Sequence, residues 1–272
     1  MNSNLVKRAI FGALYVGLIL AAILLRGHWL YMGVFGLLAF LGNWEWSNLV
    51  STHRIFPLRR ISDAAATVYL FWSTHEIADK GIEASLLLVP YAGYLLYILV
   101  RSIYSEREAM PTDLAKVIFG QIYVGGFLSM ANIFYTDEGT SILLLAIFVC
   151  IWVNDTGAYL AGSTFGKHKL FPSVSPKKSW EGFFGGFVAS AVAAGLLLGW
   201  EQAYYGVLIS IIATWGDLFE SMIKRSVGVK DSGSILPGHG GILDRIDSLL
   251  FVLPFMAFLQ WIIYTYTTLH LA

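Results

Sequence analysis

Residues 140–162 read T-S-I-L-L-L-A-I-F-V-C-I-W-V-N-D-T-G-A-Y-L-A-G, an apolar stretch interrupted by one carboxylate, Asp155. A helix needs about 20 mainly apolar residues to cross the hydrocarbon core of a bilayer, so this stretch predicts a transmembrane helix. A carboxylate at that depth costs about 2.5–3.5 kcal/mol even on the most lenient insertion scale, and it is expected to face a partner or water. Asp155 therefore suits either a packing contact with Tyr159 or Thr156, or a functional site.

The composition of the whole chain also indicates a membrane protein. Of the 272 residues, 57% are hydrophobic and 13% are charged, whereas an average soluble domain is about a quarter charged. The 18 basic and 18 acidic residues cancel, which excludes a nucleic-acid binder that works by general basic attraction. Cys150, the only cysteine, lies in an apolar run and permits neither an intrachain disulfide nor a cysteine-based metal site.

The apolar segments predict an all-α, polytopic membrane protein with about nine transmembrane helices. A cytoplasmic N-terminus places 16 of the 18 lysines and arginines on the cytoplasmic side and leaves only Arg26 and Lys80 outside. This agrees with the rule that basic residues flanking transmembrane spans stay in the cytoplasm. We expect a protein integral to a bacterial-type inner or plasma membrane. Its first span is expected to stay in the protein rather than to be cleaved as a secretory signal peptide. The predicted spans are residues 9–25, 29–47, 61–78, 83–100, 114–135, 140–162, 183–200, 203–222 and 248–269.

The chain is predicted to divide into a membrane scaffold, residues 1–135, and a catalytic region, residues 136–272. The second part contains two long cytoplasmic loops, about 163–182 and 223–247, which mix lysines, acids, serines, prolines and glycines. Both loops adjoin spans that carry acids inside the apolar run, so we expect the functional site where these loops meet the membrane.

The end of the eighth span carries a polar face. Helical spacing places Asp217, either Glu220 or Ser221, and Lys224 on one side, while Arg225 points elsewhere. This pattern fits either part of a site or a ladder of ion pairs in which Lys224 reaches the lipid headgroups.

The loop after this helix combines glycines with charged residues. Backbone N–H groups exposed by closely spaced glycines suit a phosphate cradle, although the same glycines also suit a plain turn. Asp244 and Asp247 are three residues apart at a predicted helix start, where both can project toward one Mg²⁺ bound to phosphates. Capping of the helix is the alternative for these acids. His239 suits a phosphate contact or a structural role in the loop.

The other loop contains Ser175-Pro176-Lys177-Lys178-Ser179-Trp180-Glu181-Gly182. Adjacent lysines among hydroxyl groups suit a polyphosphate ligand, although cytoplasmic loops also carry lysines simply as membrane anchors. Ser179, followed by Glu181, is expected to cap the next helix.

Together these motifs resemble the phosphatidate cytidylyltransferases, the CDP-diacylglycerol synthases. Asn154–Tyr159 and Ser175–Gly182 are similar to further elements of that family, so the resemblance covers about residues 140–260. The central pattern is Ser221-x-x-Lys224-Arg225-x-x-x-x-Lys230-Asp231-x-Gly233-x-x-Leu236-Pro237-x-His239-Gly240-Gly241-Ile242-x-Asp244-Arg245-Ile246-Asp247.

The resemblance implies that CTP and phosphatidic acid react to give CDP-diacylglycerol and diphosphate, with dependence on Mg²⁺. The expected site also has room for a second cation. It also implies a homodimer in the lipid bilayer. Asp217 and Asp244 are the expected metal ligands, by the resemblance and by carboxylate chemistry. The expected catalytic residues are Asp217, Asp244, Lys224, Arg225, Lys230 and Asp231, and the expected substrate-binding residues are Asp155, Lys177, Lys178, Ser179, Ser221, His239, Gly240, Gly241, Arg245 and Asp247.

Two other functions use the same features. A CTP-dependent polyprenol or dolichol kinase would move the γ-phosphoryl group to a lipid alcohol with similar site residues. A transporter would use the intramembrane acids as an ion path, although the sequence shows no internal repeat.

Overall fold

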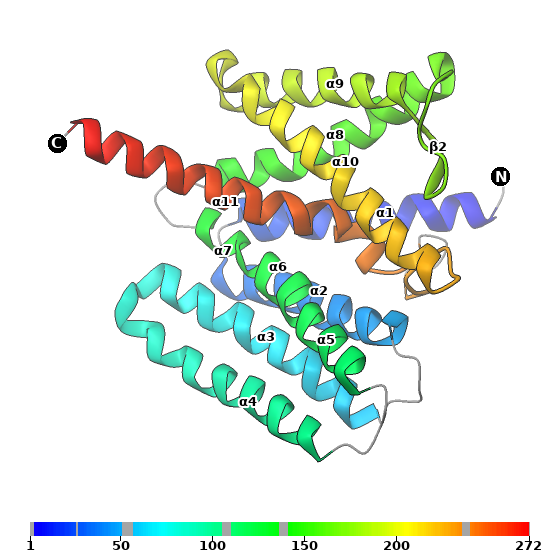
Figure 1. Ribbon diagram of the computed structural model, residues 1–272. Coiled ribbons are helices and arrows are strands. Elements are labelled where there is room, and N and C mark those ends of the chain that lie inside the picture. Colours follow the sequence, from blue (N-terminus) through cyan, green and yellow to red (C-terminus); the bar gives the residue numbers. More distant parts are fainter. Residues whose placement is uncertain are drawn as a thin grey trace. The chain divides into compact units, whose positions relative to one another are not determined.

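The computed structural model describes residues 3–25, 27–50, 57–104, 110–135, 141–235 and 240–271, and they are predominantly helical (Figure 1). Within these residues, six helical segments are long and apolar enough to cross a membrane, which confirms a polytopic helical membrane protein. Nine spans and a cytoplasmic N-terminus stay predictions. The six segments are Ile82–Ile103, Thr112–Phe134, Ile142–Phe165, Trp180–Leu198, Trp200–Ser226 and Leu243–Leu269.

The chain forms two compact units. The first comprises Met1–Thr136 together with Asp231–Arg245, and the second comprises Asp137–Lys230 together with Ile246–Ala272. The glycine-rich segment 231–245 therefore belongs to the same unit as the N-terminal helices, although it follows them by about a hundred residues in the chain.

The first unit is built from helices that run through most of the predicted N-terminal spans. In chain order they are α1 (Ser3–Leu24), α2 (His28–Val50), α3 (Pro57–Lys80), a 3₁₀ turn η1 (Ile82–Leu88) leading into α4 (Val89–Ile103), α5 (Met110–Gly120), a π-helical segment η2 (Gln121–Gly126), α6 (Phe127–Ser129) and α7 (Ala131–Phe134).

Aromatic side chains fill the interior of this unit. Tyr31, Phe35 and Phe71 are fully buried, and the Tyr31 ring stacks on Tyr135 with centroids 3.6 Å apart. The Tyr31 hydroxyl donates to Asn132 Oδ1 at 3.0 Å, and Asn132 Nδ2 donates to the carbonyl oxygen of Phe71 at 2.9 Å. These bonds pair polar groups that are costly to bury alone.

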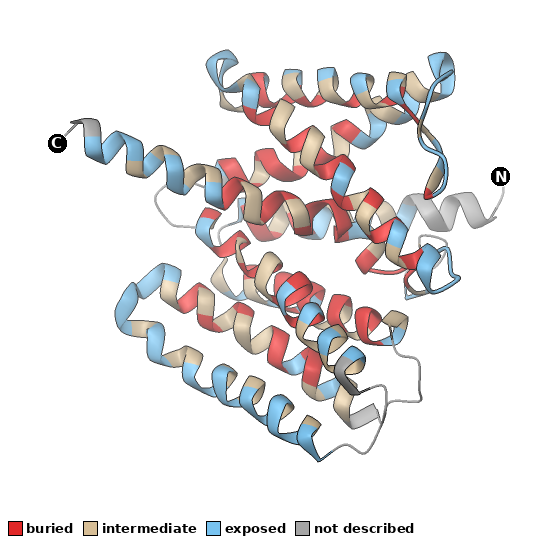
Figure 2. Cartoon of the chain, in the orientation of Figure 1, coloured by how far each residue is buried: buried red, intermediate tan, exposed pale blue. Residues whose placement is uncertain are grey.

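Helix α4 presents the opposite pattern, because none of its residues is buried (Figure 2). Its exposed side chains include Leu96, Val100 and Ile103. Apolar side chains exposed along a whole helix are what contact with lipid tails requires.

The second unit contains α8 (Ser141–Phe165), strands β1 (Lys169–Phe171) and β2 (Ser175–Ser179), α9 (Trp180–Leu198), η3 (Trp200–Gln202), α10 (Ala203–Ser226) and most of α11 (Leu243–Leu271). Helix α9 packs against both α8 and α10 (Figure 1). Glycines make the α8–α9 contact close: a Cβ at Gly157 would lie 2.9 Å from the Gly185 carbonyl oxygen, and one at Gly186 would lie 2.5 Å from Asn154 Oδ1.

One element departs from the all-α prediction. Residues 163–182, expected to be a loop, contain an antiparallel β-hairpin in which Lys169 pairs with Ser179 and Phe171 with Ser175. The hairpin extends from the junction of α8 and α9 (Figure 1). Its strands are short and mostly polar, so the alternation that identifies strands in a sequence is missing.

Candidate active site

The second unit has a pocket of about 440 Å³ that gathers five of the predicted site residues. Helices α8, α9 and α10 and the hairpin all contribute to its wall, so acids from two helices face lysines from one strand. The lining residues are Asp155, Ala158, Tyr159, Gly162, Ser163, Leu170, Lys177, Lys178, Ser179, Phe183, Thr214 and Asp217.

Asp217 on α10 contacts a lysine and a serine. The Lys178 ammonium lies 2.6 Å from Asp217 Oδ2, and the Ser221 hydroxyl donates to Oδ1 at 3.2 Å. The two side chains of the ion pair are 25% and 35% exposed, so both remain open to the pocket. Strand β2 thus places the positive charge of Lys178 beside Asp217, which is one of the two expected metal ligands.

Asp155 on α8 faces the same pocket and is exposed. Asn154 Nδ2 donates to Asp155 Oδ1 at 3.3 Å, and Asn154 Oδ1 in turn accepts from the Ser210 hydroxyl at 2.6 Å. The Thr156 hydroxyl donates to the carbonyl oxygen of Trp152 at 2.8 Å. Of the two interpretations of Asp155, the geometry favours the site residue, because its carboxylate lines the pocket.

Asp247, in the first turns of α11, is buried, and its carboxylate accepts from the Ser248 N–H at 2.6 Å. Asp217, Glu220 and Asp155 all act electrostatically on Asp247, so four acids converge within this unit. Helical spacing places Glu220 on the polar face of α10, although it was not among the predicted site residues.

The oxygen donors of this pocket suit a hard cation such as Mg²⁺, which prefers carboxylate and water ligands. Among the described residues, however, no group of three or more acids, histidines or cysteines has the arrangement of a preformed metal site. Asp217 already contacts Lys178, so a cation bound to Asp217 requires Lys178 to turn toward another anion. A phosphate group is an anion of that kind.

The bases at the end of α10 have local partners. Lys224 is buried and lies 2.6 Å from Glu220 Oε2, so an ion pair of the ladder type exists, with Glu220 as the acid. Arg225 Nη1 donates to the Val229 carbonyl oxygen at 2.7 Å, just beyond the helix end. Lys230 is exposed. The catalytic roles expected of these three bases stay predictions.

In the first unit, Asp244 closes the glycine-rich segment. Its carboxylate accepts from the Ser232 N–H at 3.0 Å and from the Gly241 N–H at 2.8 Å. Gly240 has φ of +80°, a conformation that glycine adopts readily and other residues rarely. Asp244 thus ties the glycine-rich segment to the first turn of α11. The N–H groups that it binds precede the helix, so these bonds are not helix capping, and its role as a metal ligand stays a prediction.

Glu45, near the end of α2, is a residue that the sequence analysis missed. It is 2% exposed, and its Oε2 accepts from the Ser232 hydroxyl at 3.2 Å and from the Leu243 N–H at 2.8 Å. A Cβ at Gly233 or Gly241 would lie 2.4 Å or 2.3 Å from a Glu45 oxygen, so a larger residue at either position would force this carboxylate to move. An acid inside a predicted span was the available signal.

The remaining predicted site residues that the structure describes do not line the pocket of the second unit. His239 lies outside the described residues. Asp231 and Arg245 are exposed in the first unit, and the Arg245 carbonyl oxygen accepts from the Tyr15 hydroxyl at 3.1 Å. Gly240 and Gly241 form the turn that Asp244 closes.

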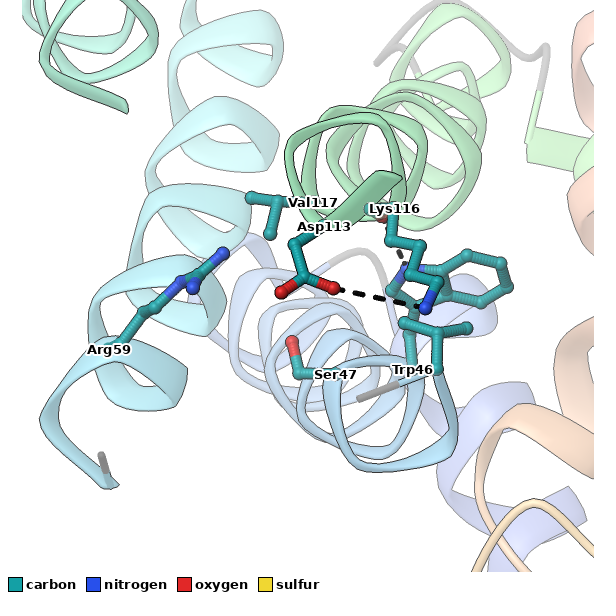
Figure 3. Close-up of a pocket in the computed structure, with 7 residues that line it drawn as sticks. Trp46, Ser47, Arg59, Asp113, Lys116 and Val117 are labelled. Carbon is teal, nitrogen blue, oxygen red and sulfur yellow. Dashed lines mark hydrogen bonds and ion pairs between the residues drawn. The ribbon is translucent and has the colours of Figure 1, made fainter. Parts of the chain in front are cut away.

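A second, much smaller pocket lies in the first unit, between α2, α3 and α5 (Figure 3). Trp46 Nε1 donates to the Lys116 carbonyl oxygen at 2.9 Å, and Lys116 Nζ lies 3.9 Å from Asp113 Oδ1. Its volume of about 20 Å³ has room for about one water molecule, so it is too small for a nucleotide or a lipid headgroup. None of the predicted site residues lines it.

Known proteins resemble this chain over nearly its whole length. The family model described as the cytidylyltransferase family matches residues 6–263. A phosphatidate cytidylyltransferase of Haemophilus influenzae is 32% identical over 94% of this chain and 99% of its own length. Phosphatidate cytidylyltransferases of Staphylococcus haemolyticus and Staphylococcus aureus are 41% and 42% identical, each over 58% of this chain and 64% of the relative. This chain therefore belongs to the cytidylyltransferase family.

Proposed function

We propose that this protein is a membrane nucleotidyltransferase that converts CTP and phosphatidic acid into CDP-diacylglycerol and diphosphate. The observation that carries the proposal is the pocket in which Lys177 and Lys178 face Asp155 and Asp217 among apolar helices. A nucleotide triphosphate needs cationic ligands, and a lipid phosphate needs a site at the membrane boundary. The relatives' name, phosphatidate cytidylyltransferase, supports this pair of substrates.

In the proposed reaction, a phosphate oxygen of phosphatidic acid attacks the α-phosphorus of CTP, and diphosphate leaves. The attacking oxygen is already anionic, so a general base is not required. The protein's main task is to hold two repelling anions in line and to stabilise the charge that develops. Lys177 and Lys178 have the position and the charge for this task.

Mg²⁺, when bound, would neutralise phosphate oxygens and favour departure of diphosphate. Asp217 is the ligand that we propose for it within the pocket, because its carboxylate is partly exposed there. Asp155 lines the same pocket and supplies further negative charge. The assignment of Asp244 as a ligand rests on the family resemblance and on carboxylate chemistry, and the proposal leaves room for a second cation.

The proposal includes an orientation in the membrane. With nine spans and the N-terminus in the cytoplasm, the hairpin and the end of α10 face the cytoplasm, where CTP is made available. The excess of lysines and arginines on that side supports this orientation. A homodimer is expected from the resemblance.

Labelled CTP tests the reaction directly. With phosphatidic acid and Mg²⁺, label on the α-phosphate should enter the lipid and label on the γ-phosphate should not. Withdrawal of Mg²⁺ should abolish the transfer. Transfer of the γ-label to a lipid alcohol would instead identify a kinase, and ion flux in liposomes without CTP consumption would identify a transporter.

A further inference from the structure

The hairpin that carries Lys177 and Lys178 is small and depends on support from outside itself. It has two short strands with a register shift between the paired positions, and Val174 and Ser179 are its only buried residues. A two-stranded hairpin on its own is marginally stable in water. Something else must therefore hold Lys178 within 2.6 Å of Asp217.

Glu181, in the first turn of α9, supplies that support. Its carboxylate accepts from the Lys167 N–H at 3.1 Å and from the His168 N–H at 3.2 Å, and it lies 2.6 Å from His168 Nδ1. One side chain thus binds two successive backbone N–H groups immediately before β1. Hydrogen bonds to a charged acceptor are about twice as strong as neutral ones.

Two further hydrogen bonds attach the hairpin to the start of α9. The Trp180 N–H donates to the His168 carbonyl oxygen at 2.9 Å, and the Ser179 hydroxyl accepts from the Gly182 N–H at 3.1 Å. The chain entering β1 and the chain leaving β2 are therefore both tied to the start of α9. Capping of α9 alone does not explain Glu181, because the groups that it binds are 13 and 14 residues away in the chain.

We propose that Glu181 is a positioning residue that sets the place of Lys177 and Lys178 in the pocket. It does not line the pocket, so it acts through the lysines rather than on a substrate. Lys178 is three residues from Glu181, and a displacement of about 1 Å at a reacting group costs about 100-fold in rate. This inference rests on the proposed function for its kinetic part only.

The first arm of the test needs no substrate. Limited trypsin digestion, followed by mass spectrometry, measures cleavage after Lys177 and Lys178 in the full-length protein in detergent. Glu181→Ala should accelerate this cleavage at least tenfold. Glu201→Ala, at an exposed acid beyond the other end of α9, is the matched control and should cleave like the wild type. Unchanged cleavage in Glu181→Ala would overturn the proposal, whatever reaction the protein catalyses.

The second arm separates a positioning role from a general loss of structure. Glu181→Ala should lower kcat/KM for CTP about 100-fold, and the isosteric Glu181→Gln, which still accepts hydrogen bonds, about tenfold. In the triple variant Glu181→Ala/Lys177→Gln/Lys178→Gln, the loss should be no larger than that of the double variant Lys177→Gln/Lys178→Gln, because Glu181 acts through these two lysines. Losses that multiply would refute this coupling. If the wild type does not transfer the α-label, the proposed function fails, and the proteolysis arm still decides the role of Glu181.

Discussion

Replacing Lys178 by glutamine separates the role of this lysine in reaction from its role in stability. Its ammonium lies 2.6 Å from Asp217 Oδ2, but the two side chains are 25% and 35% exposed. Ion pairs with that degree of exposure contribute about 0–1 kcal/mol to stability. For a chain of this size, we therefore expect the midpoint of thermal unfolding to fall by only a few degrees.

The expected effect on the reaction is much larger. Loss of one preorganised donor to the developing charge costs about 2.7–4 kcal/mol, which corresponds to about 100- to 1,000-fold in rate. Lys178→Gln should lower kcat/KM for CTP by that factor, because its charge is available to a phosphate once the nucleotide enters the pocket. Lys169→Gln is the control: Lys169 lies on the paired strand and is exposed but does not line the pocket. It should remain within about twofold of the wild type.

The assay combines transfer of α-labelled CTP to phosphatidic acid with thermal unfolding of the same detergent preparation. A Lys178→Gln variant that keeps more than a third of wild-type activity would refute the phosphate-binding role. A variant that loses activity only together with a large drop in the unfolding midpoint would refute the separation of the two roles.

Three other substitutions test separate parts of the structure. Asp244→Asn should abolish CTP turnover with little change in folding, because the amide keeps one oxygen for the Ser232 and Gly241 N–H groups; wild-type-like turnover would exclude Asp244 as a metal ligand. Gly186→Val should destabilise the α8–α9 contact by about 1–3 kcal/mol, since its Cβ would lie 2.5 Å from Asn154 Oδ1, and an unchanged unfolding midpoint would contradict this packing. Glu45→Leu should cost about 1–3 kcal/mol and speed trypsin cleavage after Lys230, because the Ser232 hydroxyl and the Leu243 N–H lose their acceptor; cleavage at the wild-type rate would contradict a role of Glu45 in holding this segment.

Much of the site was visible in the sequence because its chemistry is unusual for a membrane helix. Asp155 and Asp217 are acids beside apolar runs, and such acids are costly unless they face a partner or water. Lys177 and Lys178 stand next to each other among hydroxyl groups. In the structure, these four residues line one pocket, and their roles in the reaction stay predictions.

The residues that sequence reasoning missed act through contacts distant in the chain. Glu45 binds Ser232 and Leu243, which follow it by 187 and 198 residues. Glu181 was expected only to help cap a helix, whereas its carboxylate also binds the segment that leads into β1. No local pattern encodes such pairings.

The sequence by itself determined that this is a helical membrane protein of the cytidylyltransferase type, because apolar length and motif spacing are local properties of the chain. Only the tertiary structure decided which charges meet. It directs Lys224 to Glu220 and Lys178 to Asp217, and it uses Asp244 to close a turn. The physical reason is that a side chain's partner depends on where the fold places neighbouring segments, and one helix or one loop read alone does not contain that information.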